Sequence, residues 1–365
     1  MRLRPERAGL DPARRPDAVT ATGPYDRRVG AVLTPVQQHT LDLLAKQGAP
    51  VVFESDVVAD IRTRLDTGLA ELTERFDHVV GESAEDGSKD LATPPRDLWV
   101  TKRDLHSVFT CEASWAAPDD FTWTPARAKG QVAHRAIQLL VHWRGEPVPA
   151  TVVDEALARI ADEDFGLAAW LAAIGEADRA ELRSLAVENV TKFVECFPPL
   201  EGRWYPVTEG TVQYPRRGRI VLRAKPDLTL GIARGQESRK VIVDLKTGRL
   251  QTRHRDDLRY YALVETMARA VPPRLLASYS LDSGSADVET VTAEMLRSTL
   301  VRTLDGIERM VEITAEARQP ERRASVVCRW CVLRADCDPG REFLAGGPGR
   351  LAGGPGRLAD TGDPQ

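Results

Sequence analysis

The stretch "VIVDLKTG", residues 241–248, ends an apolar run with two charged side chains. The apolar residues before Asp244, together with Leu245, predict a buried strand. Residues two apart on a strand point to the same face, so Asp244 and Lys246 are expected to lie side by side. Charged groups are rarely buried unless they are paired or bind a metal. The pattern therefore indicates a functional site rather than an ordinary core strand.

A second carboxylate lies about one hairpin upstream, where "KPDLTLG" places Asp227 at a strand end. If the two strands are antiparallel neighbours, Asp227 and Asp244 come close together. Two close carboxylates repel unless a positive charge lies between them, and Mg²⁺ can supply it with few carboxylates plus water. In phosphodiester hydrolysis such a cation orients the attacking water, which Lys246 could hold or polarise. The sequence therefore predicts a hydrolytic metal site.

Two arginine-rich runs flank this strand in the sequence. They are either solvated surface groups or phosphate contacts, and we favour phosphate contacts. The net charge of -4 does not decide the matter, because the distribution of charge over the surface determines nucleic-acid binding. The candidate DNA-binding residues are Arg216, Arg217, Arg219, Arg249, Arg253 and Arg255.

Length and composition favour a globular protein, since 365 residues with 42% hydrophobic residues can bury a real core. No apolar stretch approaches the roughly 20 residues that span a bilayer, and the arginine-rich start lacks the apolar segment of a signal peptide. We therefore expect a cytoplasmic protein.

The chain divides into four predicted segments. Residues 1–30 are expected to be a disordered basic N-terminus, 31–96 a helical segment and linker, 97–340 the main domain, and 341–365 a disordered tail containing a tandem LAGGPGR repeat. Within the main domain, helices precede strand-like runs at "TEGTVQYP", "GRIVLRAKPDLTLGI" and "RKVIVDLKTG", and the helical pattern "DDLRYYALVETMARA" follows.

On these motifs the sequence resembles the PD-(D/E)XK nucleases and, within them, the RecB-type branch. The matching residues are the G-x-x-x-H motif that ends at His134, the Pro-Asp pair that ends at Asp227, the Asp-x-Lys motif of Asp244 and Lys246, and Tyr261 on the following helix. The resemblance implies an α/β, restriction-endonuclease-like core with a central mixed sheet flanked by helices.

The resemblance also implies roles for these residues. His134, Asp227 and Asp244 would bind Mg²⁺ or Mn²⁺, Lys246 would assist the water, and the helix of Tyr261 would contact DNA. Glu209, on the preceding strand, resembles an auxiliary acidic ligand. Taken alone, His134 and Tyr261 could be core residues. Asp257 stands where the family has Gln, which affects the polar contact of that helix.

The cysteines give a separate signal. "VCRWCVLRADC" supplies Cys328, Cys331 and Cys337, and Cys111 lies far upstream; five cysteines are too few for a disulfide scaffold, so these thiols suggest metal. The layout resembles the iron-staple subgroup of RecB-type nucleases, such as AddB-like and CRISPR adaptation nucleases, and implies a [4Fe–4S] cluster that closes the fold. Four thiolates also suit zinc, which is the alternative. Cys196 fits neither pattern and is predicted to be a buried apolar thiol.

The resemblance implies metal-dependent cleavage of DNA, on single strands or ends, in a repair, CRISPR or phage-defence context, with a separate helicase, ATPase or defence subunit as a partner. The alternative is a nuclease-like nucleic-acid-binding or assembly subunit with weak or no hydrolysis. Intact Asp227, Asp244 and Lys246 favour the enzyme, whereas Asp257 favours the alternative. The flanking arginine runs argue against a third possibility, a metalloprotein without a nucleic-acid partner.

Overall fold

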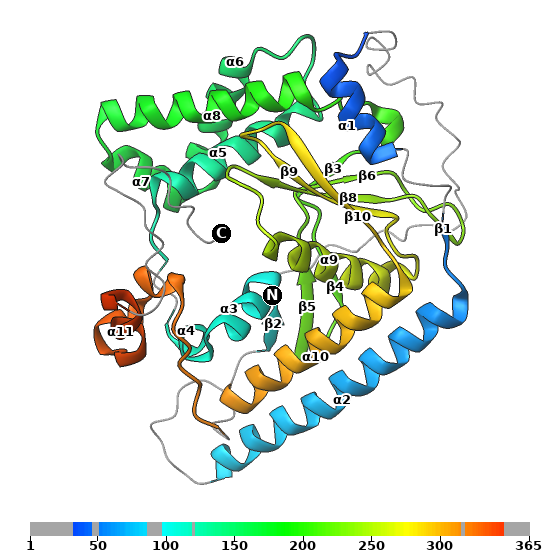
Figure 1. The fold of residues 1–365 in the computed structure, drawn as a ribbon, viewed down its shortest axis with the longest axis vertical. Coiled ribbons are helices and arrows are strands. Elements are labelled where there is room, and N and C mark those ends of the chain that lie inside the picture. Colours follow the sequence, from blue (N-terminus) through cyan, green and yellow to red (C-terminus); the bar gives the residue numbers. More distant parts are fainter. Residues whose placement is uncertain (1–31, 46–50, 86–96, 119–120, 315–317, 347–365) are drawn as a thin grey trace, which may run out of the picture. The chain divides into compact units, whose positions relative to one another are not determined.

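The computed structural model describes residues 32–45, 51–85, 97–118, 121–314 and 318–346 (Figure 1). Those from Leu33 onward belong to one compact unit. The predicted disorder of residues 1–30, the linker at 86–96 and the repeat region at 347–365 lie outside the described residues.

The helices are α1 (Pro35–Ala45), α2 (Ser55–Glu85), α3 (Lys102–Thr110), α4 (Glu112–Ala116), α5 (Pro125–Leu140), α6 (Pro149–Glu163), α7 (Phe165–Ala173), α8 (Glu176–Cys196), α9 (Arg253–Arg269), α10 (Ala293–Thr314) and α11 (Asp338–Gly346), with short 3-10 helices η1 (Gly202–Trp204), η2 (Val326–Arg329) and η3 (Val332–Asp336). The strands are β1 (Val51–Val52), β2 (Leu98–Val100), β3 (Val207–Thr208), β4 (Val212–Tyr214), β5 (Ile220–Ala224), β6 (Leu228–Leu230), β7 (Glu237–Ser238), β8 (Val241–Lys246), β9 (Leu275–Ser280) and β10 (Ser285–Thr290).

The five-stranded sheet that carries β8 has the strand order β10-β9-β8-β6-β3. The central strand β8 is parallel to β9, and the other neighbouring pairs are antiparallel, so the sheet is mixed. In the β6–β8 pair Leu228 lies opposite Val243. One residue further along, Asp227 and Asp244 are therefore brought to the same end of neighbouring strands.

The strands form more than the single central sheet that the sequence predicted. A three-stranded sheet, β2-β5-β4, and a two-stranded sheet, β1-β7, lie beside the five-stranded one. Two predicted strands are each divided between sheets. One breaks at Glu209, whose backbone is left-handed with φ 54°, and the other breaks at Pro226, which cannot donate a hydrogen bond to a ladder.

Helices cover both faces of the five-stranded sheet. Val243 and Leu245 of β8 belong to a buried cluster with Ile137 of α5 and Phe193 of α8. Ile242, which points the other way, belongs to the cluster that contains the buried side chains of α9. The alternation of β8 thus places α5 and α8 on one face and α9 on the other, with the charged end of the strand between them.

The first helices of the described chain pack on the main domain. Helix α2 runs beside α10 (Figure 1), and its buried residues Ile61, Leu65 and Phe76 share the cluster that contains α9 and α10. At the other end, residues 341–346, assigned from the sequence to the disordered tail, are the second half of α11. Among the described residues no helix is long and apolar enough to cross a membrane.

Candidate active site

The carboxylate of Asp244 is buried at the end of β8 between two ammonium groups. Lys246 Nζ lies 2.8 Å from Asp244 Oδ2, and Lys102 Nζ, at the start of α3, lies 2.9 Å from Oδ1. Burial by itself would raise the pKa of Asp244, but the two ammonium groups outweigh it and hold the pKa below its usual value. Asp244 is therefore ionised in the folded protein at neutral pH.

Asp227 is fixed beside this group by the neighbouring strand. Its Oδ2 accepts a hydrogen bond of 2.7 Å from the backbone N–H of Leu245, and its Oδ1 lies 3.5 Å from His134 Nδ1. Burial raises the pKa of Asp227, yet the adjacent imidazole prevails and the net shift is downward. The β6–β8 ladder and one backbone donor thus bring the second carboxylate into place.

The ligand atoms of His134, Glu209 and Asp227 lie within 4.8 Å of one another. His134 comes from α5, where its Nε2 is buried without a hydrogen-bond partner among the described residues. Burial lowers the pKa of His134, but the adjacent carboxylate of Asp227 outweighs this effect, so the net shift is upward. Oxygen donors with one imidazole suit Mg²⁺ or Mn²⁺, so these three residues could hold such a cation.

Glu209 reaches this group from a turn rather than from the strand that the sequence predicted. It follows β3 in a left-handed conformation, and its backbone N–H donates a hydrogen bond of 3.1 Å to Asp227 O. Its carboxylate pairs with Lys225 Nζ at 2.5 Å. This turn places the carboxylate of Glu209 near His134 and Asp227.

Replacing His134 by Ala is expected to raise the divalent-cation concentration needed for half-maximal DNA cleavage by about 10- to 100-fold, because one of the candidate ligands is lost. Excess Mn²⁺ should restore part of the rate. The check is a metal titration of cleavage, with replacement of the exposed His39 of α1 by Ala as the control. An unchanged titration would indicate that His134 is a packed core histidine and not a metal ligand.

Helix α9 supplies two adjacent tyrosines with different contacts. Tyr260 donates a hydrogen bond of 2.6 Å to Val100 O and accepts one of 3.2 Å from the backbone of Arg223, so it ties α9 to the second sheet. Tyr261 is also buried, and its ring lies 4.8 Å from Lys102 Nζ. Burial raises the pKa of Tyr261 above its usual range, so its hydroxyl remains protonated.

Asp257, which stands where the resemblance expects Gln, faces Lys102 with Oδ2 3.9 Å from Nζ. Burial raises the pKa of Asp257 to about 6, although Lys102 opposes this shift. The acidic replacement is therefore accommodated beside a lysine from another helix.

Two residues of the site had no pattern that pointed to them. Lys102 lies 142 residues before Asp244 in the chain, and nothing in its neighbourhood marks it except the Thr-x-x-Asp capping pattern that starts α3. His254, in the first turn of α9, is buried and accepts a hydrogen bond at Nδ1 from the backbone of Gln251. Burial and then Lys246 lower the pKa of His254 to about 4, so it is neutral at pH 7.

The candidate DNA-binding arginines lie in several places. Arg249 is exposed and lies three residues after the end of β8. Arg216 and Arg217 line a cavity beside the far end of α9, about 18 Å of helix from Asp257. Arg219 pairs with Asp77 and Asp97, and Arg255 pairs with Asp287, which partly satisfies their charge. Arg253 begins α9 and, with Arg249, lies nearest to Asp244 in sequence.

One cavity gathers the four cysteines of the predicted staple. It lies between α4 and the C-terminal segment, residues 318–346, and is lined by Cys111, Cys328, Cys331 and Cys337. A Cβ on buried Gly340 would lie 3.3 Å from Cys337 Sγ, a tight contact, and 3.4 Å from Cys328 Sγ, so a side chain here would press on the thiols. In the part of the chain that the structure describes, no three of these sulfur atoms lie within 4.8 Å of one another. The cavity thus gathers the four thiols without forming a closed single-ion site.

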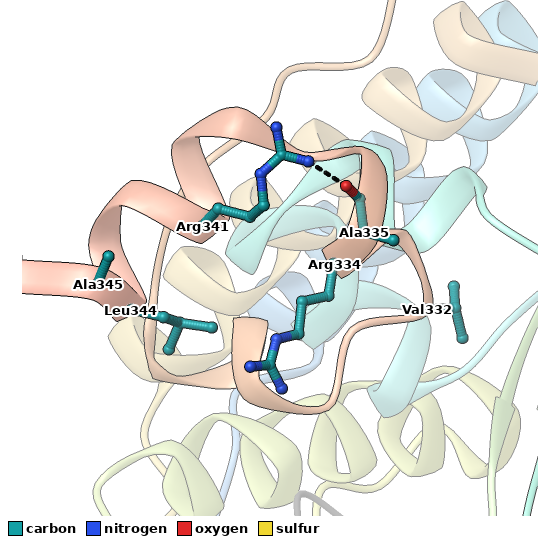
Figure 2. Close-up of a pocket in the computed structure, with 6 residues that line it drawn as sticks. All are labelled: Val332, Arg334, Ala335, Arg341, Leu344 and Ala345. Carbon is teal, nitrogen blue, oxygen red and sulfur yellow. Dashed lines mark hydrogen bonds between the residues drawn. The ribbon is translucent and has the colours of Figure 1, made fainter.

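The outer side of the same segment carries a second hollow, lined by η3 and α11 (Figure 2). Arg341 extends across it and donates a hydrogen bond to Ala335 O, which joins the two elements. Cys196 lies elsewhere, at the end of α8, where a Cβ on Gly284 would come within 2.7 Å of its sulfur. Cys196 is partly buried rather than fully buried as predicted, because it ends α8 at the surface, and it does not line the cavity of the other four cysteines.

A buried carboxylate joins α4 to the C-terminal segment next to Cys111. Glu112 is 3% exposed, and its Oε2 accepts hydrogen bonds of 2.5 Å from Arg318 and 2.9 Å from the backbone N–H of Glu321. Its Oε1 accepts hydrogen bonds of 3.1 Å from Arg318 and 3.3 Å from Arg309. The Arg318 hydrogen bonds lower the pKa of Glu112 to about 2 against the opposing effect of burial.

This pKa predicts a pH-dependent contribution to stability. The folded-state pKa of Glu112 is lower than its unfolded value of 4.5, so its contribution is full above pH 4.5 and is lost as pH falls toward about 2. A shift of this size corresponds to roughly 3 to 4 kcal/mol. Urea unfolding of the parent and of Glu112→Gln should differ most at pH 7, and the difference should shrink below pH 4.5. A difference that does not change between pH 7 and 3 would contradict this role.

The structure combines mixed sheets flanked by helices with two carboxylates, a lysine and a histidine gathered at one strand end. This combination is typical of a restriction-endonuclease-like α/β domain. The model of the PD-(D/E)XK nuclease superfamily matches residues 104–338. That match covers more than half of the chain, which therefore belongs to the PD-(D/E)XK nuclease superfamily.

Two solved structures are similar in part. A candidate exonuclease from Eubacterium rectale is 10% identical with a TM-score of 0.39, over 64% of this chain and 88% of that one. The protein SSO0001 is 16% identical with a TM-score of 0.27, over 57% of this chain and 95% of that one. At these TM-scores neither likeness supports an inference about function. No curated protein matches the sequence.

Proposed function

We propose that this protein is a RecB-type nuclease that hydrolyses phosphodiester bonds of DNA, on single strands or at ends, with Mg²⁺ or Mn²⁺. Membership of the nuclease superfamily gives the reaction class. The observation that carries the proposal is the gathering of Asp227, Asp244, Lys246 and His134 at the ends of β6 and β8.

His134, Asp227 and Glu209 would hold the cation. Asp244, which the resemblance gave as a ligand, would lie beside them, because its two oxygens are 2.8 Å from Lys246 Nζ and 2.9 Å from Lys102 Nζ. When bound, the cation would offset charge on the phosphate and orient the attacking water. Lys246, 2.8 Å from Asp244, is placed to position that water, and the backbone of Leu245 keeps Asp227 in orientation. The exposed Arg249 is the candidate contact to the DNA backbone, because a guanidinium donates hydrogen bonds to phosphate. Tyr261, the tyrosine that the resemblance assigns to DNA contact, is buried with its ring against Lys102, so it would act by supporting that lysine.

The test is incubation of anaerobically purified protein with labelled linear single-stranded, linear double-stranded and closed circular DNA in Mn²⁺. Cleavage of linear strands with little effect on circles is the expected result. Binding without cleavage of any of the three would favour the alternative function, a nuclease-like binding or assembly subunit in a repair, CRISPR or phage-defence complex, for which a helicase or ATPase subunit would be a partner.

We also propose that Cys111, Cys328, Cys331 and Cys337 hold a [4Fe–4S] cluster. Their common cavity and the crowding that a side chain at Gly340 would cause support it. Four thiolates would also suit zinc, and the resemblance to the iron-staple subgroup is what favours the iron–sulfur cluster. The cluster would have a structural role, since hydrolysis needs no electron transfer.

A further inference from the structure

Lys102 makes contacts that its place at the start of α3 does not require. Its ammonium lies 2.9 Å from Asp244 Oδ1, 3.9 Å from Asp257 Oδ2 and 4.8 Å from the centre of the Tyr261 ring. The side chain is 22% exposed, so it is not sealed inside the core. It lines a small hollow together with His106 and Asp257. Lys102 is thus a partly accessible cation within the cluster of candidate catalytic groups.

The backbone of Lys102 is held from both sides. Thr101 caps α3 through a capping box with Asp104, whose Oδ2 accepts 2.9 Å from the N–H of Thr101. One residue earlier, Val100 O accepts the hydroxyl of Tyr260 at 2.6 Å. These contacts fix the start of α3 to α9, so the ammonium is positioned before any substrate arrives.

Folding alone gives little reason for a second lysine at Asp244. Lys246 already neutralises this carboxylate at 2.8 Å, and a buried ion pair rarely stabilises a fold more than apolar side chains of similar volume would. Lys102 donates one hydrogen bond to Asp244 Oδ1 and lies beyond hydrogen-bond distance of Asp257, at 3.9 Å, so its ammonium, which has three N–H donors, can also donate to an anion. In a nuclease the anion that reaches this place is the phosphate of the substrate.

We propose that Lys102 contacts the scissile phosphate and supplies the positive charge that a second metal ion supplies in two-metal nucleases, so that hydrolysis here uses one divalent cation. The inference rests on the proposed nuclease function. In the reaction a water oxygen bonds to phosphorus, the ester bond from phosphorus to the leaving oxygen breaks, and one hydrogen of the water ends on that oxygen. Lys102 stabilises the charge on the phosphate and transfers no proton.

The test compares Lys102→Met with Lys240→Met. Lys240 is the matched control, because its side chain is also 22% exposed and pairs with the buried carboxylate of Glu265, at the opposite end of β8. Both variants remove an ion pair to a buried carboxylate, and Lys240→Met should lower the melting temperature at least as much, because Asp244 keeps Lys246 at 2.8 Å whereas Glu265 keeps Arg269 at 4.0 Å. Only Lys102→Met should lower kcat, on the order of 100-fold, with KM for a single-stranded oligonucleotide within about threefold. Lys102→Arg should recover at least about tenfold of that loss.

A Mn²⁺ titration of the cleavage rate gives a second readout, and its result for the parent does not depend on the fold of any variant. The parent should follow a first-order dependence on Mn²⁺, whereas Lys102→Met should become steeper because a second ion can enter the vacated place. A parent that requires two ions, or Lys102→Met with the kcat of Lys240→Met, would overturn the inference while the nuclease function stands. A parent that cuts no DNA would overturn the proposed function, and this inference with it.

Discussion

Replacing Asp244 by Asn is expected to lower the rate of DNA cleavage by at least about 10³-fold while DNA affinity stays within about threefold. Asn keeps the shape of the side chain but removes the negative charge that lies between Lys102 and Lys246. Affinity should persist because it comes mainly from contacts between basic side chains and phosphates. Cleavage and binding are measured on the same labelled strand, binding in the presence of Ca²⁺.

Glu265→Gln is the matched control for this variant. Glu265 is also a buried carboxylate paired with a lysine, but it lies near the other end of α9, away from Asp227 and His134. Both variants should lose comparable stability, and Glu265→Gln should keep the parental cleavage rate. Lys246→Met should behave like Asp244→Asn. If Asp244→Asn and Lys246→Met both cut at the parental rate, the site is elsewhere.

Replacing any one of Cys111, Cys328, Cys331 and Cys337 by Ser is expected to remove the brown colour of the anaerobically purified protein and to lower its melting temperature. The parent should contain about four irons and four acid-labile sulfides per chain. The loss follows because the cluster would tie α4 to the C-terminal segment, and binding energy at such a site is folding energy. Cys196→Ser, at a cysteine that packs against Gly284 outside the cavity, should retain colour and metal content.

The contacts of Glu112 limit how far the cysteine variants should unfold. Arg318 and the backbone of Glu321 hold the same two segments together without any metal. Cys111→Ser should therefore lose the cluster while α4 and the C-terminal segment stay in contact. Combining Cys111→Ser with Glu112→Gln should expose the C-terminal segment to protease far more than either change alone. Zinc in place of iron would contradict the cluster, and full metal content in Cys111→Ser would contradict the four-cysteine site.

The sequence could place Asp227 near Asp244 because a hairpin carries both, and the distance between them follows from strand pairing. It could place Lys246 because side chains alternate along a strand. These are local rules that act over a few residues. The mixed sheet flanked by helices follows from the family resemblance, but its division into separate sheets depends on the backbone conformation at Glu209 and on Pro226, which a pattern of apolar residues does not display.

Long-range partners could not be predicted in this way. Lys102 meets Asp244 only because α3 packs against α9, and Glu112 meets Arg318 only because the C-terminal segment returns to α4. Neither pair has a fixed spacing, since the intervening chain can vary without moving the contact. The ion pairs of Arg219 could not be predicted either, because its partners Asp77 and Asp97 come from distant segments of the chain.

The central claim, that the chain cuts DNA with a divalent cation bound beside Asp227 and Asp244, is tested most directly by a metal add-back measurement. Anaerobically purified protein is freed of divalent cations by a brief wash with EDTA, and release of label from a single-stranded oligonucleotide is followed as Mg²⁺ or Mn²⁺ is restored. The account predicts no release without metal, and release that rises with Mn²⁺ in the parent but not in Asp244→Asn. Release without metal, or equal release by the parent and Asp244→Asn, would contradict it.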